Sequence, residues 1–159
     1  TVVKVAGKKY YLWVALCSET RVVLAWHLSP YRDTIQAIRL LRAAIRNSQT
    51  QPAVLITDRY PAYVSAFYAD CPHAEHIRVN SFEDLISNNT LERFMGTFKD
   101  WYKKLRGFKS YNSAVALISF WVTCYNFARP HSGLNNWSPA EVAGFTPKFK
   151  HNRWFSMIA

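Results

Sequence analysis

The chain has 159 residues, half of them apolar, which suits one domain with a substantial core. It carries 20 Lys and Arg against 10 Asp and Glu, and this net charge of +10 points to a polyanionic partner, with basic charge that merely aids solubility as the alternative. No apolar run reaches the ~20 residues that cross a bilayer and no signal peptide opens the chain, so we expect no membrane partner.

The chain begins with three segments typical of β-strands, at Thr1–Ala6, Tyr10–Cys17 and Arg21–Leu28. Each is rich in β-branched or aromatic residues, and the connections between them are short enough to be turns. These features predict an antiparallel meander, which Pro30 ends.

A helix is predicted next, because Asp33 or Thr34 can cap a segment that runs to about Asn47. Four apolar residues mark its expected core face: Ile35, Ile38, Leu41 and Ile45. Three basic residues form a separate stripe: Arg39, Arg42 and Arg46. This stripe suits either phosphate contacts or an ordinary solvated helix face.

The middle of the chain alternates between strand and helix. The expected elements are a fully buried strand at Ala53–Thr57, a short helix at Tyr60–Tyr68, a weaker strand at Ala74–Val79 and a loop at Asn80–Ser87. Together with the meander they predict an α/β fold, in which a mixed sheet carries helices on both faces. Chemistry in such sheets collects at strand ends, and Asp58 directly follows the apolar run.

The stretch Asn88–Lys109 predicts an amphipathic helix that Gly107 ends. Its apolar stripe has seven members: Leu91, Phe94, Met95, Phe98, Trp101, Tyr102 and Leu105. Glu92 lies off this stripe, and none of the residues three or four positions away from it is a cation. An unpaired carboxylate on a basic helix suits a metal site beside nucleic-acid phosphates better than a surface salt bridge.

A second helix is predicted from Ser110 to Phe127, and its part from Ala114 onward is apolar nearly all round. Such a helix is either deeply buried or packed against a second chain or another domain. A loop follows at Arg129–Trp137, and Ser138–Glu141 has the order of a helix start with proline in the first turn. We interpret His131 as a structural residue that could assist at a nucleic acid.

Asp58 and Glu92 are candidate ligands for divalent cations. Two-metal phosphoryl chemistry needs carboxylates on rigid elements around two ions ~3.5–4 Å apart. Hard oxygen ligands favour Mg²⁺ or Mn²⁺ over zinc. For Asp58, an N-cap of the following helix is an equally good interpretation.

The cysteines indicate reduced thiols. Cys17, Cys71 and Cys124 are odd in number and form no CxxC pair, which is typical of a cytosolic protein. A zinc site at Cys71, His73 and His76 would lack a fourth ligand at a suitable spacing.

Five motifs together cover nearly the whole chain: VKVAGKKYYLW, LITDRYPAY, NNTLERFMGTFKDWYKKLRGF, YNFARPHSGL and SPAEVAG. In these motifs and their order the chain resembles the catalytic core of bacterial and archaeal insertion-sequence transposases of the DDE class, relatives of the retroviral integrases. The resemblance implies a ribonuclease-H-like fold with a five-stranded sheet in the order 3-2-1-4-5, the first three strands antiparallel. It also implies two Mg²⁺ (or Mn²⁺) ions on three acidic ligands, of which Asp58 and Glu92 match the second and third.

The same resemblance implies partners. DNA would be bound as transposon ends and target, by a homodimer or larger assembly in the cytoplasm, at the nucleoid. Six cations are candidate DNA-binding residues: Arg59, Arg93, Lys99, Lys103, Lys104 and Arg106. Lys99 and Lys103 lie about two and three turns after Glu92 on its face of the helix, where they could hold phosphates or remain an ordinary solvated surface.

The first acidic ligand of the family is missing. It lies in an Asp-Glu-Thr triplet whose threonine matches Thr1, and neither Glu19 in a turn nor Asp33 at a helix cap replaces it well. We therefore expect a catalytic core at residues 1–145 that starts within its first strand, and a C-terminal tail at residues 146–159. As given, the chain should bind metal poorly and show little or no strand transfer. The alternative is a catalytically inactive remnant that only binds DNA or oligomerises; a ribonuclease-H-like nuclease acting on RNA is disfavoured by the motifs.

Overall fold

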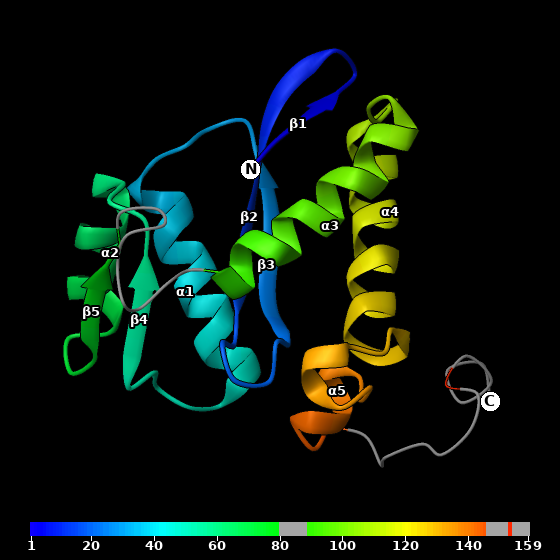
Figure 1. The fold of residues 1–159 in the computed structure, drawn as a ribbon. Helices are drawn as coiled ribbons and strands as arrows, with labels where there is room; N and C mark the ends of the chain where they lie inside the picture. Colours follow the sequence, from blue (N-terminus) through cyan, green and yellow to red (C-terminus); the bar gives the residue numbers. More distant parts are fainter. Residues whose placement is uncertain (80–88, 146–152, 154–159) are drawn as a thin grey trace.

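The computed structural model of the chain describes residues 1–79, 89–145 and 153. Its first three strands, β1 (Val2–Val5), β2 (Lys8–Leu16) and β3 (Val23–Ser29), form an antiparallel sheet with β2 in the centre (Figure 1). The predicted meander is confirmed. The predicted loop at residues 80–87 and the tail at residues 146–159, Arg153 apart, lie outside the described residues.

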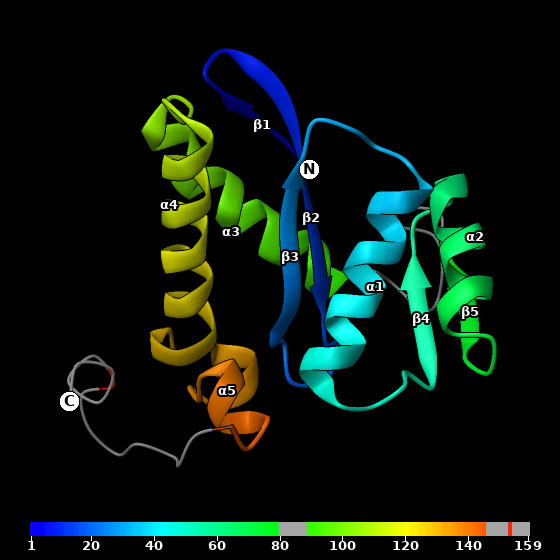
Figure 2. The same ribbon diagram turned by 180° about the vertical axis from the view of Figure 1, so that it is seen from behind.

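Helices cover both faces of this sheet, as predicted, and four of them do so: α1 (Thr34–Ser48), α2 (Pro61–Asp70), α3 (Asn89–Leu105) and α4 (Tyr111–Thr123). Side chains of β2 alternate between two hydrophobic cores. Leu12 and Val14 pack with residues of α3 and α4, whereas Trp13 packs with residues of α1 and α2. Figures 1 and 2 show the sheet standing between these two pairs of helices.

The remaining strands, β4 (Val54–Thr57) and β5 (Glu75–Arg78), form a separate parallel pair. The expected five-stranded order is not confirmed, because no pairing joins β1 to β4 among the described residues. The free edge of β1 instead meets Phe108, whose carbonyl accepts from the Ala6 N–H at 2.8 Å and whose N–H donates to the Lys4 carbonyl at 2.9 Å.

The expectation that β4 is fully buried is wrong. Val54 is 45% exposed, and of the four residues only Thr57 is buried. The physical reason is that β4 pairs on one side only in the described part of the chain, so it lies at the edge of a two-stranded sheet.

The start of α1 is predicted correctly, because Asp33 is its N-cap and accepts the Gln36 N–H at 3.0 Å. The core face is only partly right. The stripe that packs on the sheet is centred on small residues and includes Ala37 and Ala44, so Leu41 is buried while Ile35 is 60% exposed.

The link between α3 and α4 is a tight turn. Arg106 and Gly107 both have positive φ, at 54° and 106°, and Ser110 then caps α4 by accepting the Ser113 N–H. The predicted helix changes character before Phe127, because α4 passes into a π-helix, η1 (Cys124–Ala128). Of the two alternatives for this helix, deep burial does not hold, since Phe120 is 63% exposed, and packing against a second chain or another domain stays a prediction.

The C-terminal part of the fold is tied to the sheet by Asn126 of η1. Its buried side-chain amide accepts from the Val23 N–H at 2.9 Å and donates to the Val23 carbonyl at 3.1 Å. The chain continues through a short 3₁₀-helix, η2 (Ser132–Leu134), to α5 (Pro139–Val142), which has the predicted proline in its first turn. No helix in the described ranges is long and apolar enough to cross a membrane.

Candidate active site and nucleic-acid interface

Asp58 lies where β4 ends, directly after the buried Thr57. Its Oδ1 accepts the Tyr60 N–H at 3.1 Å, and its Oδ2 lies 3.6 Å from Nη2 of Arg32. The side chain of Asp58 is nevertheless 57% exposed. The N-cap of α2 is Tyr60 rather than Asp58, so Asp58 makes a local turn bond through Oδ1 while Oδ2 faces Arg32 in an exposed ion pair.

Arg32 is a residue of this site that the sequence did not reveal. Its guanidinium carbon lies 3.9 Å from the centre of the Tyr60 ring, and the Tyr60 hydroxyl donates to the Arg32 carbonyl. A cation–π contact and a hydrogen bond thus hold Arg32 beside Asp58. Arg32 precedes the N-cap of α1, and nothing in its local sequence indicates that it contacts Asp58, which comes after both α1 and β4 in the chain.

Glu92 lies in the first turn of α3, where the positive end of the helix dipole favours a carboxylate. It is exposed, and it forms no ion pair with any residue that the structure describes. The opposite side of the helix is fixed in the core by Phe94 and Phe98, which are 2% and 0% exposed. The helix therefore holds Glu92 out toward solvent, as its position off the apolar stripe predicted.

The start of β1 lies near Asp58 and near Lys99 of α3. The pKa of the Thr1 amino group is lowered to about 6, first by burial and then by the charges of Lys99 and Arg32, whereas Asp58 opposes the shift. Lys99 of α3 and Asp58 after β4 therefore both lie close enough to Thr1 to act on its charge.

The donor chemistry of the site fits a magnesium or manganese ion. Asp58 and Glu92 offer exposed carboxylate oxygens, which Mg²⁺ prefers, and such an ion needs only one or two carboxylates when waters and phosphates complete its shell. No group of three His, Cys, Asp or Glu side chains gathers within the described ranges. The described residues therefore suit an ion that nucleic acid or a further ligand helps to hold.

The other predicted cations are spread along the surface. Arg59 and Lys104 are exposed, and Arg106 lies in the turn after α3. Lys103 lies 3.6 Å from Asp100, but both side chains are 76% exposed, so this pair is a weak one.

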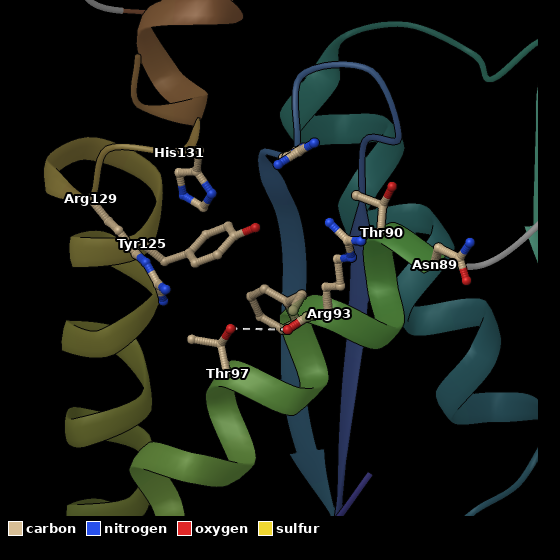
Figure 3. A pocket seen from close by; sticks show the side chains of 9 residues that line it. Asn89, Thr90, Arg93, Thr97, Tyr125, Arg129 and His131 are labelled. Carbon is tan, nitrogen blue, oxygen red and sulfur yellow. Dashed lines mark hydrogen bonds between the residues drawn. The ribbon is translucent and has the colours of Figure 1, made fainter. Parts of the chain in front are cut away.

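Arg93 lies instead in a pocket of about 270 Å³ on another side of α3 (Figure 3). Two further arginines that the sequence did not single out line the same pocket: Arg21 in the turn between β2 and β3, and Arg129 directly after η1. Tyr125 and His131 contribute aromatic rings to the wall, with ring centres 4.7 Å apart.

Burial lowers the pKa of His131 to about 4, and the charges of Arg129 and Arg21 add to this shift, whereas a hydrogen bond with the Tyr125 carbonyl opposes it. In the unfolded chain His131 has an ordinary pKa near 6.5, so between about pH 6.5 and pH 4 the unfolded state binds a proton that the folded state does not. The contribution of His131 to the free energy of unfolding should therefore be fully present above about pH 6.5 and decrease as the pH falls toward 4. At about pH 5 the decrease should be at most about 2 kcal/mol.

We expect His131→Gln to reduce this acid sensitivity in urea unfolding at about pH 7 and about pH 5. The reduction should be partial, because the pKa values of His27 and His76 are lowered too, both mainly by burial. The exposed His73 is the control, and His73→Gln should leave the pH dependence as it is. Equal acid sensitivity of His131→Gln and the unchanged protein would contradict the assignment.

The Cys71 region is structural in the described fold. The ring of His76 lies 2.8 Å from the Thr57 hydroxyl and stacks on Phe67 with centroids 4.6 Å apart. Cys71 is buried and ends α2.

Comparison with known proteins gives one family and a set of related folds. Residues 1–131 match the family described as the DDE domain. The catalytic core domain of HTLV-2 integrase in complex with magnesium, in its dimeric and trimeric forms, has a TM-score of 0.66 with 18% and 17% identity, and the match covers 90% of each chain.

The intasome of simian T-cell lymphotropic virus, in complex with the PP2A regulatory subunit B56 gamma, matches with a TM-score of 0.69 and 16% identity. That match covers 96% of this chain but 55% of the viral chain, so the present chain spans about half the length of that relative. At these identities the likeness establishes a shared ribonuclease-H-like fold. None of the curated proteins is similar enough to count as a relative.

Proposed function

The chain belongs to the DDE domain family of transposase and integrase catalytic domains, and from that premise we propose that it is the catalytic domain of a DNA transposase. In this proposal the domain cuts DNA and joins a 3′-hydroxyl to target DNA by metal-assisted transesterification. The observation that carries the proposal is the placement of two exposed carboxylates directly after or on regular elements, Asp58 at the end of β4 and Glu92 in the first turn of α3.

Asp58 and Glu92 would hold the ions, Asp58 from the connection directly after β4 and Glu92 from the first turn of α3. The Tyr60 N–H orients the Asp58 carboxylate, and Phe94 and Phe98 fix the helix that carries Glu92. When bound, Mg²⁺ or Mn²⁺ supplies the Lewis acidity that lowers the pKa of an attacking water or 3′-hydroxyl and stabilises the leaving oxygen.

Lys99 would bind a phosphate beside this site. It projects from α3 about two turns after Glu92, and its charge reaches Thr1. Arg32 would have a different role, because its contact with Asp58 has to loosen when the carboxylate takes a metal. Arg59, Lys103, Lys104 and Arg106 would add affinity that falls with salt and carries no sequence preference.

We further propose that an Asp two positions before Thr1 completes the site as its third carboxylate. The test compares residues 1–159 with the same chain carrying Asp-Glu, or Asn-Gln as a control, immediately before Thr1. We expect negligible Mn²⁺-dependent plasmid nicking and strand transfer from residues 1–159 and from the Asn-Gln chain, and clear activity from the Asp-Glu chain. The same extension would lengthen β1 alongside β4, which is the pairing that the order 3-2-1-4-5 requires.

Robust activity of residues 1–159 alone would refute the need for the third ligand. An Asp-Glu chain that binds DNA but neither binds Mn²⁺ in calorimetry nor nicks DNA would favour the alternative of a DNA-binding remnant. This outcome is distinguishable from misfolding, because circular dichroism of the three chains should coincide.

We also propose that the protein acts on DNA as a homodimer or larger assembly in the cytoplasm, at the nucleoid. Leu117 and Phe120 of α4 support self-association, since they are 40% and 63% exposed on a helix with few polar residues. Transposon ends and target DNA would be the substrates.

A further inference from the structure

The pocket beside α3 gathers positive charge from three separate parts of the chain. Arg21 comes from the turn between β2 and β3, Arg93 from α3, and Arg129 from the residue after η1. No carboxylate is among the described residues that line the pocket, and none of the three arginines forms an ion pair with a residue that the structure describes. Three like charges around one concave space repel each other, and a bound anion would relieve that repulsion.

The fold holds Arg21 in this pocket by its backbone and by the space left at Gly133. Arg21 has a φ of 63°, which a residue other than glycine seldom adopts, and its N–H donates to the Cys17 carbonyl at 2.8 Å. A Cβ on Gly133 would lie 2.3 Å from Nη2 of Arg21, so the absence of a side chain there is what admits the guanidinium. The glycine of the RPHSGL motif is thus explained by this contact and not by its own backbone angle.

The rest of the wall is suited to an anion of small size. Figure 3 shows Arg93 on one side and Arg129 and His131 on the other, with Tyr125 between them. Nε2 of His131 is buried and has no hydrogen-bond partner among the described residues. At about 270 Å³ the pocket has ample room for a phosphate group, whose negative charge the three arginines complement.

We propose that Arg21, Arg93 and Arg129 form a receptor for one phosphate group of a DNA strand. The identity of the strand as DNA rests on the proposed function, whereas the phosphate site itself does not. Arginine binds phosphate through two parallel N–H donors, so three guanidinium groups can satisfy all its free oxygens. Because Arg93 follows Glu92 directly, the two side chains point about 100° apart around α3, and the strand would pass from the pocket over the first turn of the helix to Glu92.

The first arm of the test measures the pocket without DNA. We expect millimolar inorganic phosphate to raise the melting temperature of the protein and to raise the pKa of His131 in an NMR titration, because a bound anion stabilises the protonated ring. Arg21→Gln, Arg129→Gln and Gly133→Ala should each reduce both effects. Gly133→Ala leaves the charge unchanged and displaces only the guanidinium of Arg21. Weaker phosphate binding by this variant would therefore show that the position of Arg21 matters.

The second arm measures binding of a short DNA duplex by fluorescence anisotropy at several salt concentrations. We expect about tenfold weaker binding for Arg21→Gln and Arg129→Gln, and a salt slope that is smaller by about one. Gly133→Ala should lose comparable affinity. The control Lys8→Gln removes one exposed charge at the turn between β1 and β2, and should cost less than about threefold.

The outcomes separate the two proposals. If the unchanged protein binds phosphate and the pocket variants do not, the phosphate site is supported. If the duplex then fails to bind, the proposed function is refuted but the phosphate site is still supported. Duplex binding that is equally strong in all pocket variants, or equally weakened by Lys8→Gln, overturns the inference while the proposed function survives. Absence of any phosphate effect in the unchanged protein overturns it as well. Unaltered circular dichroism of Arg129→Gln, whose side chain is exposed, guards against a folding artefact.

Discussion

Replacing Asp58 by asparagine in the Asp-Glu-extended chain is expected to reduce metal-dependent strand transfer by about 10³-fold or more, equivalent to about 4 kcal/mol of activation free energy. Asparagine keeps an oxygen that can accept the Tyr60 N–H at 3.1 Å, so the local turn should survive while the negative charge that binds the ion is lost. Glu92→Gln should have an effect of the same order, because it also removes a negative charge that would bind the ion. The fold should tolerate this change, since Glu92 is exposed and forms no ion pair with a described residue.

The readouts are strand transfer with Mn²⁺, calorimetric Mn²⁺ binding and DNA affinity. DNA affinity should stay within about threefold of the unchanged protein or rise, since removing a carboxylate from a basic surface does not weaken phosphate contacts. Asp100→Asn and Glu75→Gln are matched controls at exposed positions and should keep activity. Full activity in Asp58→Asn, or an equal loss in Asp100→Asn, would refute the assignment of the site.

Phe98→Ala is expected to be the most damaging single change to stability, at about 3–5 kcal/mol. Phe98 is 0% exposed and lies at the centre of an aromatic cluster, with ring centroids 5.6 Å from Trp101, 6.1 Å from Tyr102 and 5.2 Å from Trp121. These rings are large and interlocked, so they cannot collapse into the space that the missing ring leaves.

Urea unfolding followed by circular dichroism measures this loss, and the melting temperature should fall on the order of 10 °C. Tyr31→Ala is the control, because Tyr31 is 66% exposed and its truncation should change the free energy of unfolding by less than about 0.5 kcal/mol. A cost below about 1 kcal/mol for Phe98→Ala would mean that the aromatic cluster repacks around the gap.

Local signals predicted the elements of this fold well and their pairing less well. Asp33 and Ser138 were recognisable as helix caps because a cap bonds to a residue three positions away. The apolar stripe of α3 likewise depends on a single helix. The order 3-2-1-4-5 depends on which strand edges meet, and the contact of β1 with Phe108 joins residues about a hundred positions apart, for which no local pattern exists.

The core face of α1 shows a second limit. Large apolar residues suggested a stripe that begins at Ile35, which is 60% exposed, whereas the buried face also takes in the small residues Ala37 and Ala44. Close approach of two elements favours small residues, and a pattern that weighs side chains by hydrophobicity gives alanine little weight.

The candidate site follows the same division. Asp58 and Glu92 were identified through motifs that lie within single elements, and their roles stay predictions. Arg32, Arg21 and Arg129 were missed because each acquires its neighbours only in the folded chain. Gly133 marks the pocket only once the structure is known, because its lack of a positive φ and the close approach of Arg21 are both features of the folded chain.

The double hydrogen bond between Asn126 and Val23 also sets an order of assembly. It joins residues 103 positions apart, and closing a loop of that length is entropically costly and slow compared with the local packing of α1, β4, α2 and β5. During synthesis, Asn126 can therefore cover the outer edge of β3 only after the residues between the two have been made. The arginine pocket needs a closure of similar length, because it joins Arg21 to Arg129.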